Sequence, residues 1–243
     1  MMRSIRAEIM KLRRSCIWLA MLFLPLLSAG FGTANYLGNL SILQDQWYSL
    51  WTQHALFYCT LFAPALTGVY CAYVCRLEHL NRNWNLVMTM PVSRAQIWMS
   101  KIIVVSMLTG LTQLFIGILF VLSGKVAGLT APIPLALVFW LVRGWCSLIV
   151  QTAVLLCVAL VIRSFAVPVA CGIGGGFLGI AVLVKGFGVY FPFSLLPLSM
   201  CSHNPTEPMQ CSAGLFVCMS LFYFLLACAC GISWMRRRDV QTA

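Results

Sequence analysis

Long apolar runs separated by short polar segments dominate the pattern of hydrophobic and polar positions along this chain. Each run holds the roughly 20 apolar residues that a helix needs to cross about 30 Å of hydrocarbon. The runs are continuous rather than alternating, which favours helices over a β-barrel. The pattern therefore predicts an all-α polytopic membrane protein with residues 1–243 in a single transmembrane domain. The six predicted spans are Ile17–Tyr36, Trp51–Cys75, Ile102–Ser123, Ile133–Ile162, Ala166–Val184 and Ala213–Met235.

The first and fourth runs depart from a simple span. The first run is longer than the apolar core of a signal peptide, and no clear small-x-small cleavage site follows it. We therefore expect this segment to be retained as a span. The fourth run is longer than a span requires, and Pro132 and Pro134 stand at its start. A short interfacial or tilted piece is therefore expected there.

Composition and charge agree with this class. Of the 243 residues, 61% are hydrophobic and 9% are charged, whereas a soluble domain is about a quarter charged. A formal net charge of +11 would suggest nucleic acid in a soluble protein. Here the basic residues flank apolar runs, so membrane lipids and topology explain the charge, and no nucleic-acid partner is expected.

The basic residues also predict the orientation. With the N-terminus inside, the outer loops hold only Lys125 and Lys185, so both termini are expected to be cytosolic. Most of the 16 Lys and Arg residues then lie on the cytosolic side: Arg3, Arg6, Lys11, Arg13, Arg14, Arg76, Arg82, Arg94, Lys101, Arg163, Arg236, Arg237 and Arg238.

Residues 1–16 predict a short amphipathic elbow helix before the first span. Apolar residues recur in this segment at offsets of three and four, which places them on one stripe. Such a helix rests in the inner headgroup layer, although basic flanks alone would also serve as a plain topology signal. The stripe consists of Met2, Ile5, Ile9, Leu12 and Cys16.

The longest polar segment between two spans, residues 76–101, predicts a cytosolic loop with a helix of its own. Pro91 ends this helix, and Ser93 with Gln96 forms a capping-box pattern that opens the third span. Two interpretations stay open: a rigid element that transmits force to a motor, or an ordinary loop that lies on lipid. The apolar residues at helical spacing are Leu77, Leu80, Trp84 and Val87.

Residues able to carry catalysis are scarce. None of the five acids, which are Glu8, Asp45, Glu78, Glu207 and Asp239, lies within a predicted span, so no carboxylate pair is available in the membrane. The scattered histidines predict no zinc site, and no phosphate-binding loop is present. The fifth span is rich in glycine, which predicts close helix packing. The chain is therefore expected to be neither an enzyme nor a metal protein.

Two outer features leave alternatives open. Cys201 and Cys211 share the last outer loop, and a disulfide between them is expected only if that face is oxidising. The other cysteines are interpreted as apolar packing residues. Arg143 is the only charged residue well inside a predicted span, where an unsatisfied charge costs a few kcal/mol. The alternatives are an interfacial position, an outward snorkelling side chain, a pair with Asp45 or Glu207 of the outer loops, a water-filled substrate path, and contact with a partner subunit.

Several motifs resemble the ABC-2 type permeases, in particular the subgroup found in lantibiotic-immunity and bacteriocin exporters. The loop motif is Glu78…Trp84-Asn85-Leu86…Met90-Pro91-Val92-Ser93-Arg94…Ile97-Trp98…Lys101. The opening Glu8…Lys11-Leu12-Arg13-Arg14-Ser15 resembles the N-terminal elbow of that family. Gln151 through Ser164-Phe165 resembles its fourth and fifth spans, and Arg236-Arg237-Arg238-Asp239-Val240 resembles its C-terminus.

The resemblance implies a transport subunit in a bacterial plasma membrane. Such a subunit has no cofactor of its own, because ATP and Mg belong to a partner dimer of ABC ATPase subunits. A second permease, the same or a different chain, completes the complex. The expected substrate is hydrophobic or amphipathic, with a lantibiotic-type antimicrobial peptide leading and self-immunity as the outcome. Another lipid-like molecule, a drug, or a non-transporting assembly or sensor role remains the alternative. The expected ATPase-coupling residues are Glu78, Leu80, Trp84, Val87, Met88, Met90 and Pro91.

Overall fold

The computed structural model describes residues 1–13, 15–80, 84 and 91–237. Within these residues the chain is helical and contains no strand, and six helical segments are long and apolar enough to cross a membrane. The all-α, six-span prediction is therefore confirmed. The elements are α1 (Met2–Leu12), α2 (Ile17–Gly38), α3 (Gln46–Phe57), the π-helix η1 (Tyr58–Phe62), α4 (Ala63–His79), α6 (Arg94–Val126), α7 (Ala136–Val161), α8 (Ala166–Val184), the 3-10 helix η3 (Gly188–Tyr190), α9 (Leu195–Ser199) and α10 (Ala213–Arg237).

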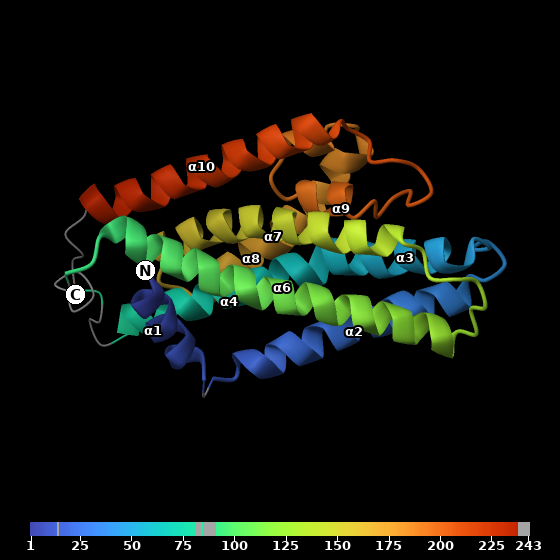
Figure 1. Cartoon of the computed structure of the whole chain (residues 1–243), viewed down its shortest axis with the longest axis horizontal. Helices are drawn as coiled ribbons and strands as arrows, with labels where there is room; N and C mark the ends of the chain where they lie inside the picture. The colour runs from blue at the N-terminus through green and yellow to red at the C-terminus, as the bar shows by residue number, and fades with distance from the viewer. Residues whose placement is uncertain (14, 81–83, 85–90, 238–243) are drawn as a thin grey trace.

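The long helices lie roughly side by side, so the molecule has two distinct ends (Figure 1). One end carries α1 and both chain termini. The other carries the connections that follow α2, α6 and α8. An even number of spans returns the chain to the end where it began, so both termini lie at the same end. Successive connections between spans alternate between the two ends.

The observed helices differ from some of the span limits that hydropathy predicts. The fifth span coincides with α8. Helix α6, which contains the third span, begins at Arg94, as the capping-box pattern predicted, although the apolar run begins only at Ile102. The hydroxyl of Ser93 accepts a hydrogen bond from the Gln96 amide at 3.2 Å and caps the helix there. Residues 129–135 form no helix, so the fourth span begins at Ala136 rather than Ile133, and no tilted helical piece precedes it. The two prolines there lie in an irregular connection.

The second span forms the centre of the bundle. In its most apolar window 78% of the residues are buried, against 22% in α10. Its middle is the π-helix η1, a widened turn that often marks functional sites in helices. The sequence pattern did not predict this turn, because an inserted residue leaves hydropathy unchanged.

Glycines of α8 let this helix pack tightly against the second span. A Cβ atom added at Gly172 would lie 2.3 Å from the Pro64 carbonyl oxygen, and one at Gly176 would lie 2.1 Å from the Thr60 carbonyl oxygen. Only glycine fits such backbone contacts, so the predicted close packing is confirmed at these positions. The prediction of close packing is wrong for Gly174, because a Cβ atom added there would meet no atom within 4 Å.

Candidate functional site

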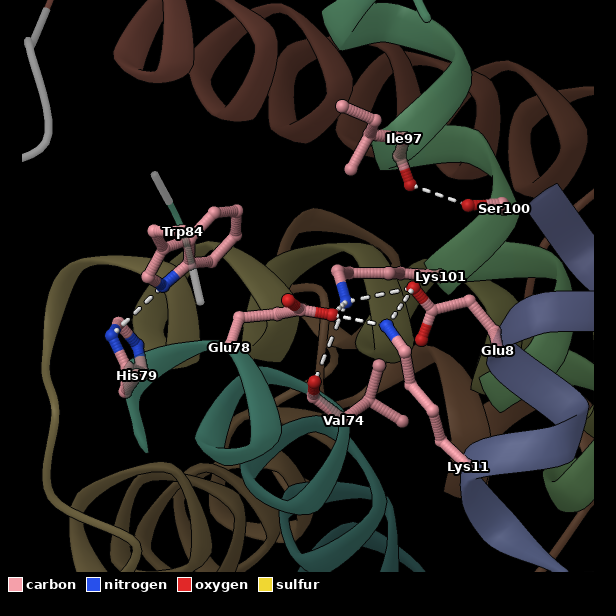
Figure 2. A network of polar contacts seen from close by, with 9 residues as sticks. All are labelled: Glu8, Lys11, Val74, Glu78, His79, Trp84, Ile97, Ser100 and Lys101. Atoms are coloured by element: carbon pink, nitrogen blue, oxygen red, sulfur yellow. Dashed lines mark hydrogen bonds and ion pairs between the residues drawn. The ribbon is translucent and has the colours of Figure 1, made fainter. Parts of the chain in front are cut away.

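Four charged side chains from three helices meet at the end of the bundle that carries the termini (Figure 2). Glu8 and Lys11 belong to α1, where a spacing of three residues places them on one face. Glu78 lies in the last turn of α4, and Lys101 lies near the start of α6. We call these four residues the charge cluster.

Each lysine of the charge cluster contacts both acids. Nζ of Lys101 lies 3.1 Å from Oε1 of Glu8 and 3.1 Å from Oε1 of Glu78. Nζ of Lys11 lies 3.1 Å from Oε1 of Glu8 and also pairs with Oε1 of Glu78. The cluster is therefore formally neutral, with opposite charges alternating around it.

Burial makes this neutrality necessary. The side chains of Lys101, Glu78 and Glu8 are 2%, 3% and 8% exposed, whereas Lys11 is 34% exposed. Burial alone would raise the pKa of the Glu78 carboxyl, but the charge of Lys101 and the hydrogen bond from Lys11 outweigh it and hold that pKa below its ordinary 4.5. A buried charge without its partner would cost several kcal/mol.

A second set of contacts joins the neighbouring loop to α7. Nε1 of Trp84 donates a hydrogen bond to Nδ1 of His79 at 3.0 Å. Nε2 of the same imidazole lies 3.1 Å from the Ala159 carbonyl oxygen, in the last turn of α7. Because Nδ1 accepts, Nε2 must carry the proton, which gives a neutral ring bridging two segments. Nζ of Lys101 lies 5.8 Å from the centre of a Trp84 ring, a cation–π distance.

The start of α6 is fixed by further polar contacts. Nε2 of Gln96 donates to the hydroxyl of Ser4 in α1 at 3.3 Å. Nη1 of Arg94 donates to the Arg236 carbonyl oxygen near the end of α10 at 2.8 Å. Thus α1, α4, α6, α7 and α10 are connected within one small region of the fold.

The structure limits how Glu78 and Trp84 could act, and their role in ATPase coupling stays a prediction. Both side chains are almost fully buried, at 2% and 4% exposure, so neither is available for the direct contact with an ATPase subunit that the motif suggested. Leu80 is 47% exposed and Pro91 is also exposed, so both remain accessible. Val87, Met88 and Met90 lie outside the described residues.

The local conformation of the loop also differs from the prediction. Helix α4 ends at His79, and Leu80 has extended backbone angles, φ −77° and ψ 145°. A single helix through Leu77 and Leu80 to Trp84 is therefore wrong. The ring of Trp84 instead folds back onto His79, which no periodicity argument from the apolar residues would have indicated (Figure 2).

The elbow is helical as predicted, and only part of its apolar stripe is buried within the protein. Met2 and Ile9 of the apolar stripe are 82% and 42% exposed, whereas Glu8 and Leu12 are buried. Sequence reasoning missed Glu8, Lys11 and Lys101 as site residues. The available signal was that acids are scarce, and that both Glu8 and Glu78 fall on the side that carries most of the basic residues.

Arg143 lies far from this site, half-buried in α7 and close to Cys201 and Cys211. Its Nε donates to the Phe139 carbonyl oxygen at 3.2 Å, and none of the ion pairs among described residues includes it. Burial raises the pKa of the Cys201 and Cys211 thiols, and the nearby charge of Arg143 opposes this rise. Both cysteines are free thiols in the structure, and a disulfide between them on an oxidising face stays a prediction.

We also compared the described residues with the requirements of a metal site. The part of the chain that the structure describes contains no group of three His, Cys, Asp or Glu side chains placed to hold a metal ion. The charge cluster itself offers two carboxylates, but two lysine ammonium groups already occupy them.

These features define a polytopic membrane protein with six apolar spans and a polar junction at one end that connects the loop before α6 to several of them. The sequence model of the ABC-2 family transporter protein matches residues 4–179. This match takes in more than half of the chain, so the chain belongs to that family and is an ABC transporter permease subunit. The family implies an ABC ATPase partner. No curated protein matches the chain.

Proposed function

We propose that this permease exports a hydrophobic or amphipathic substrate, with a lantibiotic-type antimicrobial peptide as the leading candidate. Self-immunity of the producing cell is the biological outcome of such export. The working complex contains two permeases, identical or different, and a dimer of ABC ATPase subunits that binds ATP and Mg. The motif resemblance of the loop and elbow supports this substrate class.

The proposed orientation places both termini in the cytosol of a bacterial cell, at the plasma membrane. The charge bias between the two ends of the bundle supports it. A cysteine introduced at exposed Thr206 should react with a membrane-impermeant maleimide in intact cells, and one at exposed Arg3 should not. Because the chain has native cysteines, labelling of the unsubstituted protein is the background to subtract. Labelling at Arg3 but not at Thr206 would show the opposite orientation.

The charge cluster carries the proposed coupling mechanism. It joins α1, α4 and α6 directly beneath the loop, so a movement imposed at exposed Leu80 or Pro91 passes to these helices together. Breaking one buried pair costs about 3–5 kcal/mol, which keeps the helices moving as one unit. His79 extends the connection to α7 through the Ala159 carbonyl.

Co-expression with candidate ABC ATPases tests this proposal. Leu80→Asp places a charge on the exposed loop and should reduce both co-purification of the ATPase and peptide-stimulated ATP hydrolysis. Leu40→Asp is the matched control, because Leu40 is 51% exposed, close to the 47% of Leu80, and follows α2 at the opposite end of the bundle. Equal effects of the two variants would contradict docking at the loop.

The choice of stimulating compound separates the alternatives. Stimulation by a lantibiotic supports the leading substrate. Stimulation only by a lipid-like molecule or a drug would replace that substrate and keep the export function. An ATPase that never co-purifies, with no compound-dependent hydrolysis, would favour a non-transporting assembly or sensor subunit.

A further inference from the structure

A pocket of about 490 Å³ opens at the end of the bundle opposite the termini. Three segments far apart in the sequence form its walls: residues 42–56 after α2 and in α3, the last turns of α8, and residues 202–206. Its volume falls within the range of small-ligand sites. The charge cluster lies at the other end, so nothing described so far assigns a role to this pocket.

The walls of the pocket are fixed by hydrogen bonds outside it. Nε1 of Trp47 donates to the Ala131 carbonyl oxygen at 2.7 Å, which holds the first turn of α3. Nε1 of Trp51 donates to the Met200 carbonyl oxygen at 2.8 Å and holds the start of the 202–206 segment. The pocket is therefore preformed, which lowers the entropic cost of binding.

One negative charge dominates the lining. Asp45 is the only carboxylate among the lining residues, which include His203 but no lysine or arginine. Asp45 occupies the N-cap position of α3, but its side chain makes no cap hydrogen bond, and no ion pair with another described residue involves it. Its full negative charge exceeds the roughly half positive charge of the helix terminus. The pocket therefore favours a cation.

A polar group and an apolar wall complete the site. Ser202 lines the pocket and is 4% exposed, and its hydroxyl has no hydrogen-bond partner among the described residues. Leu56 and Val184 also line it and are 38% and 65% exposed. They belong to spans, so this wall continues onto the lipid-facing surface. A ligand with a cationic group and an adjoining apolar part matches both features.

We propose that this pocket binds a cationic amphipathic peptide, with an ammonium group at Asp45 and apolar side chains against Leu56 and Val184. A phospholipid amine is disfavoured, because its phosphate would enter a lining without lysine or arginine. The proposal deepens the proposed function by giving the exported peptide a docking site, and for its substrate class it rests on that function. The site itself is tested without ATP hydrolysis.

Binding to the full chain in phosphatidylcholine nanodiscs tests the site. The probe is a dansyl-labelled amphipathic peptide of leucine and lysine, with empty nanodiscs as background. Asp45→Asn should weaken binding about tenfold, the effect of losing one charge-assisted hydrogen bond. The matched control, Glu207→Gln, removes the same charge from an exposed outer residue that does not line this pocket, and it should bind as wild type does.

A second pair of variants tests the apolar wall without altering charge. Val184→Trp should fill the wall and weaken binding. Val126→Trp, at an exposed residue that does not line the pocket, should not. Equal binding of the same peptide with acetylated lysines, or equal behaviour within either pair of variants, would overturn the proposal. Asp45-dependent retention of a phosphatidylethanolamine that the peptide does not displace would overturn it in favour of a lipid site.

The proposal and the proposed function fail separately. Asp45-dependent binding without peptide-stimulated ATP hydrolysis refutes export of the peptide and leaves the site in place. Stimulated hydrolysis that Asp45→Asn does not change refutes the site and leaves export in place.

Discussion

Nζ of Lys101 lies 3.1 Å from Oε1 of Glu78, and the two side chains are 2% and 3% exposed. Glu78 ends α4 and Lys101 lies in the first turns of α6, so this ion pair joins the two helices on either side of the loop. Glu8 of α1 shares the same ammonium group at 3.1 Å. The loop is thus anchored at both ends to one buried charge cluster.

Removing the central cation should destabilise the protein. Lys101→Met leaves two buried carboxylates with only Lys11, and an uncompensated buried charge costs about 3–5 kcal/mol. The apparent unfolding temperature in detergent, followed by size-exclusion chromatography after heating, should fall clearly. Lys125→Met is the control, because Lys125 is an exposed cation near the other end of α6.

The double variant Lys101→Met/Glu78→Gln gives the specific check. It removes one positive and one negative charge, so the cluster becomes neutral again and part of the lost stability should return. If the double variant is as unstable as the sum of the single variants, the two residues do not form an energetically coupled pair.

Acid should weaken the same cluster. The pKa of Glu78 in the folded protein is lowered from its ordinary 4.5, so its stabilisation is present above that value and is lost as the pH falls through the lower, folded pKa. The unfolding temperature of wild type should therefore fall below about pH 4.5. Glu78→Gln, which has no proton to gain there, should show a shallower decline, and an identical decline would contradict the assignment.

The spans could be predicted from the sequence because hydrocarbon imposes a length and an apolar composition on each of them. Residues 166–184 illustrate this, since the predicted limits are those of α8. The early start of α6 was predicted by the Ser93 capping-box pattern and not by hydropathy. Lys101 is charged, and it lies within the span only because acids from two other helices neutralise it.

The charge cluster itself depends on contacts that no local pattern contains. Glu8 and Lys101 are 93 positions apart, and Lys11 and Glu78 are 67 apart. A motif identified the polar loop, but it could not tell an outward side chain from an inward one. Trp84 was therefore expected on a docking face, whereas it packs against His79 and Lys101.

Substitutions at Trp84 should now act mainly on stability. Trp84→Ala removes a buried aromatic side chain and should cost about 3–5 kcal/mol. Trp84→Phe keeps a ring near Lys101 but loses the donor to His79, so it should cost only about 1 kcal/mol. Unfolding temperatures measured in detergent should follow this order. A Trp84→Ala protein as stable as wild type would contradict the buried position.

Two glycines in one helix give a matched test of packing in the membrane. Gly176→Ala would place Cβ 2.1 Å from the Thr60 carbonyl oxygen, and because backbone must move, a cost of about 1–3 kcal/mol is expected. Gly174→Ala meets nothing within 4 Å and should be neutral or slightly stabilising, since alanine is the better helix former. Equal unfolding temperatures for the two variants would show that α8 does not pack on the second span at this register.

Arg143 should control the reactivity of Cys201 and Cys211. Burial raises the pKa of Cys211, and the charge of Arg143 opposes that rise. Arg143→Leu should therefore raise this pKa further, leave less thiolate at a given pH and slow alkylation. Arg143→Lys should retain most of the wild-type rate. Peptide mapping by mass spectrometry after iodoacetamide treatment measures Cys211 separately from the other thiols.

The same two variants separate the roles left open for Arg143. A role confined to the segment that carries Cys201 and Cys211 changes the alkylation rate and leaves peptide-stimulated ATP hydrolysis unchanged. A position on the substrate path or against a partner permease makes Arg143→Leu lose that stimulation while Arg143→Lys keeps it, because the cation rather than the guanidinium shape is required. Faster alkylation in Arg143→Leu would contradict the electrostatic contact itself, since removing a positive charge cannot favour the thiolate.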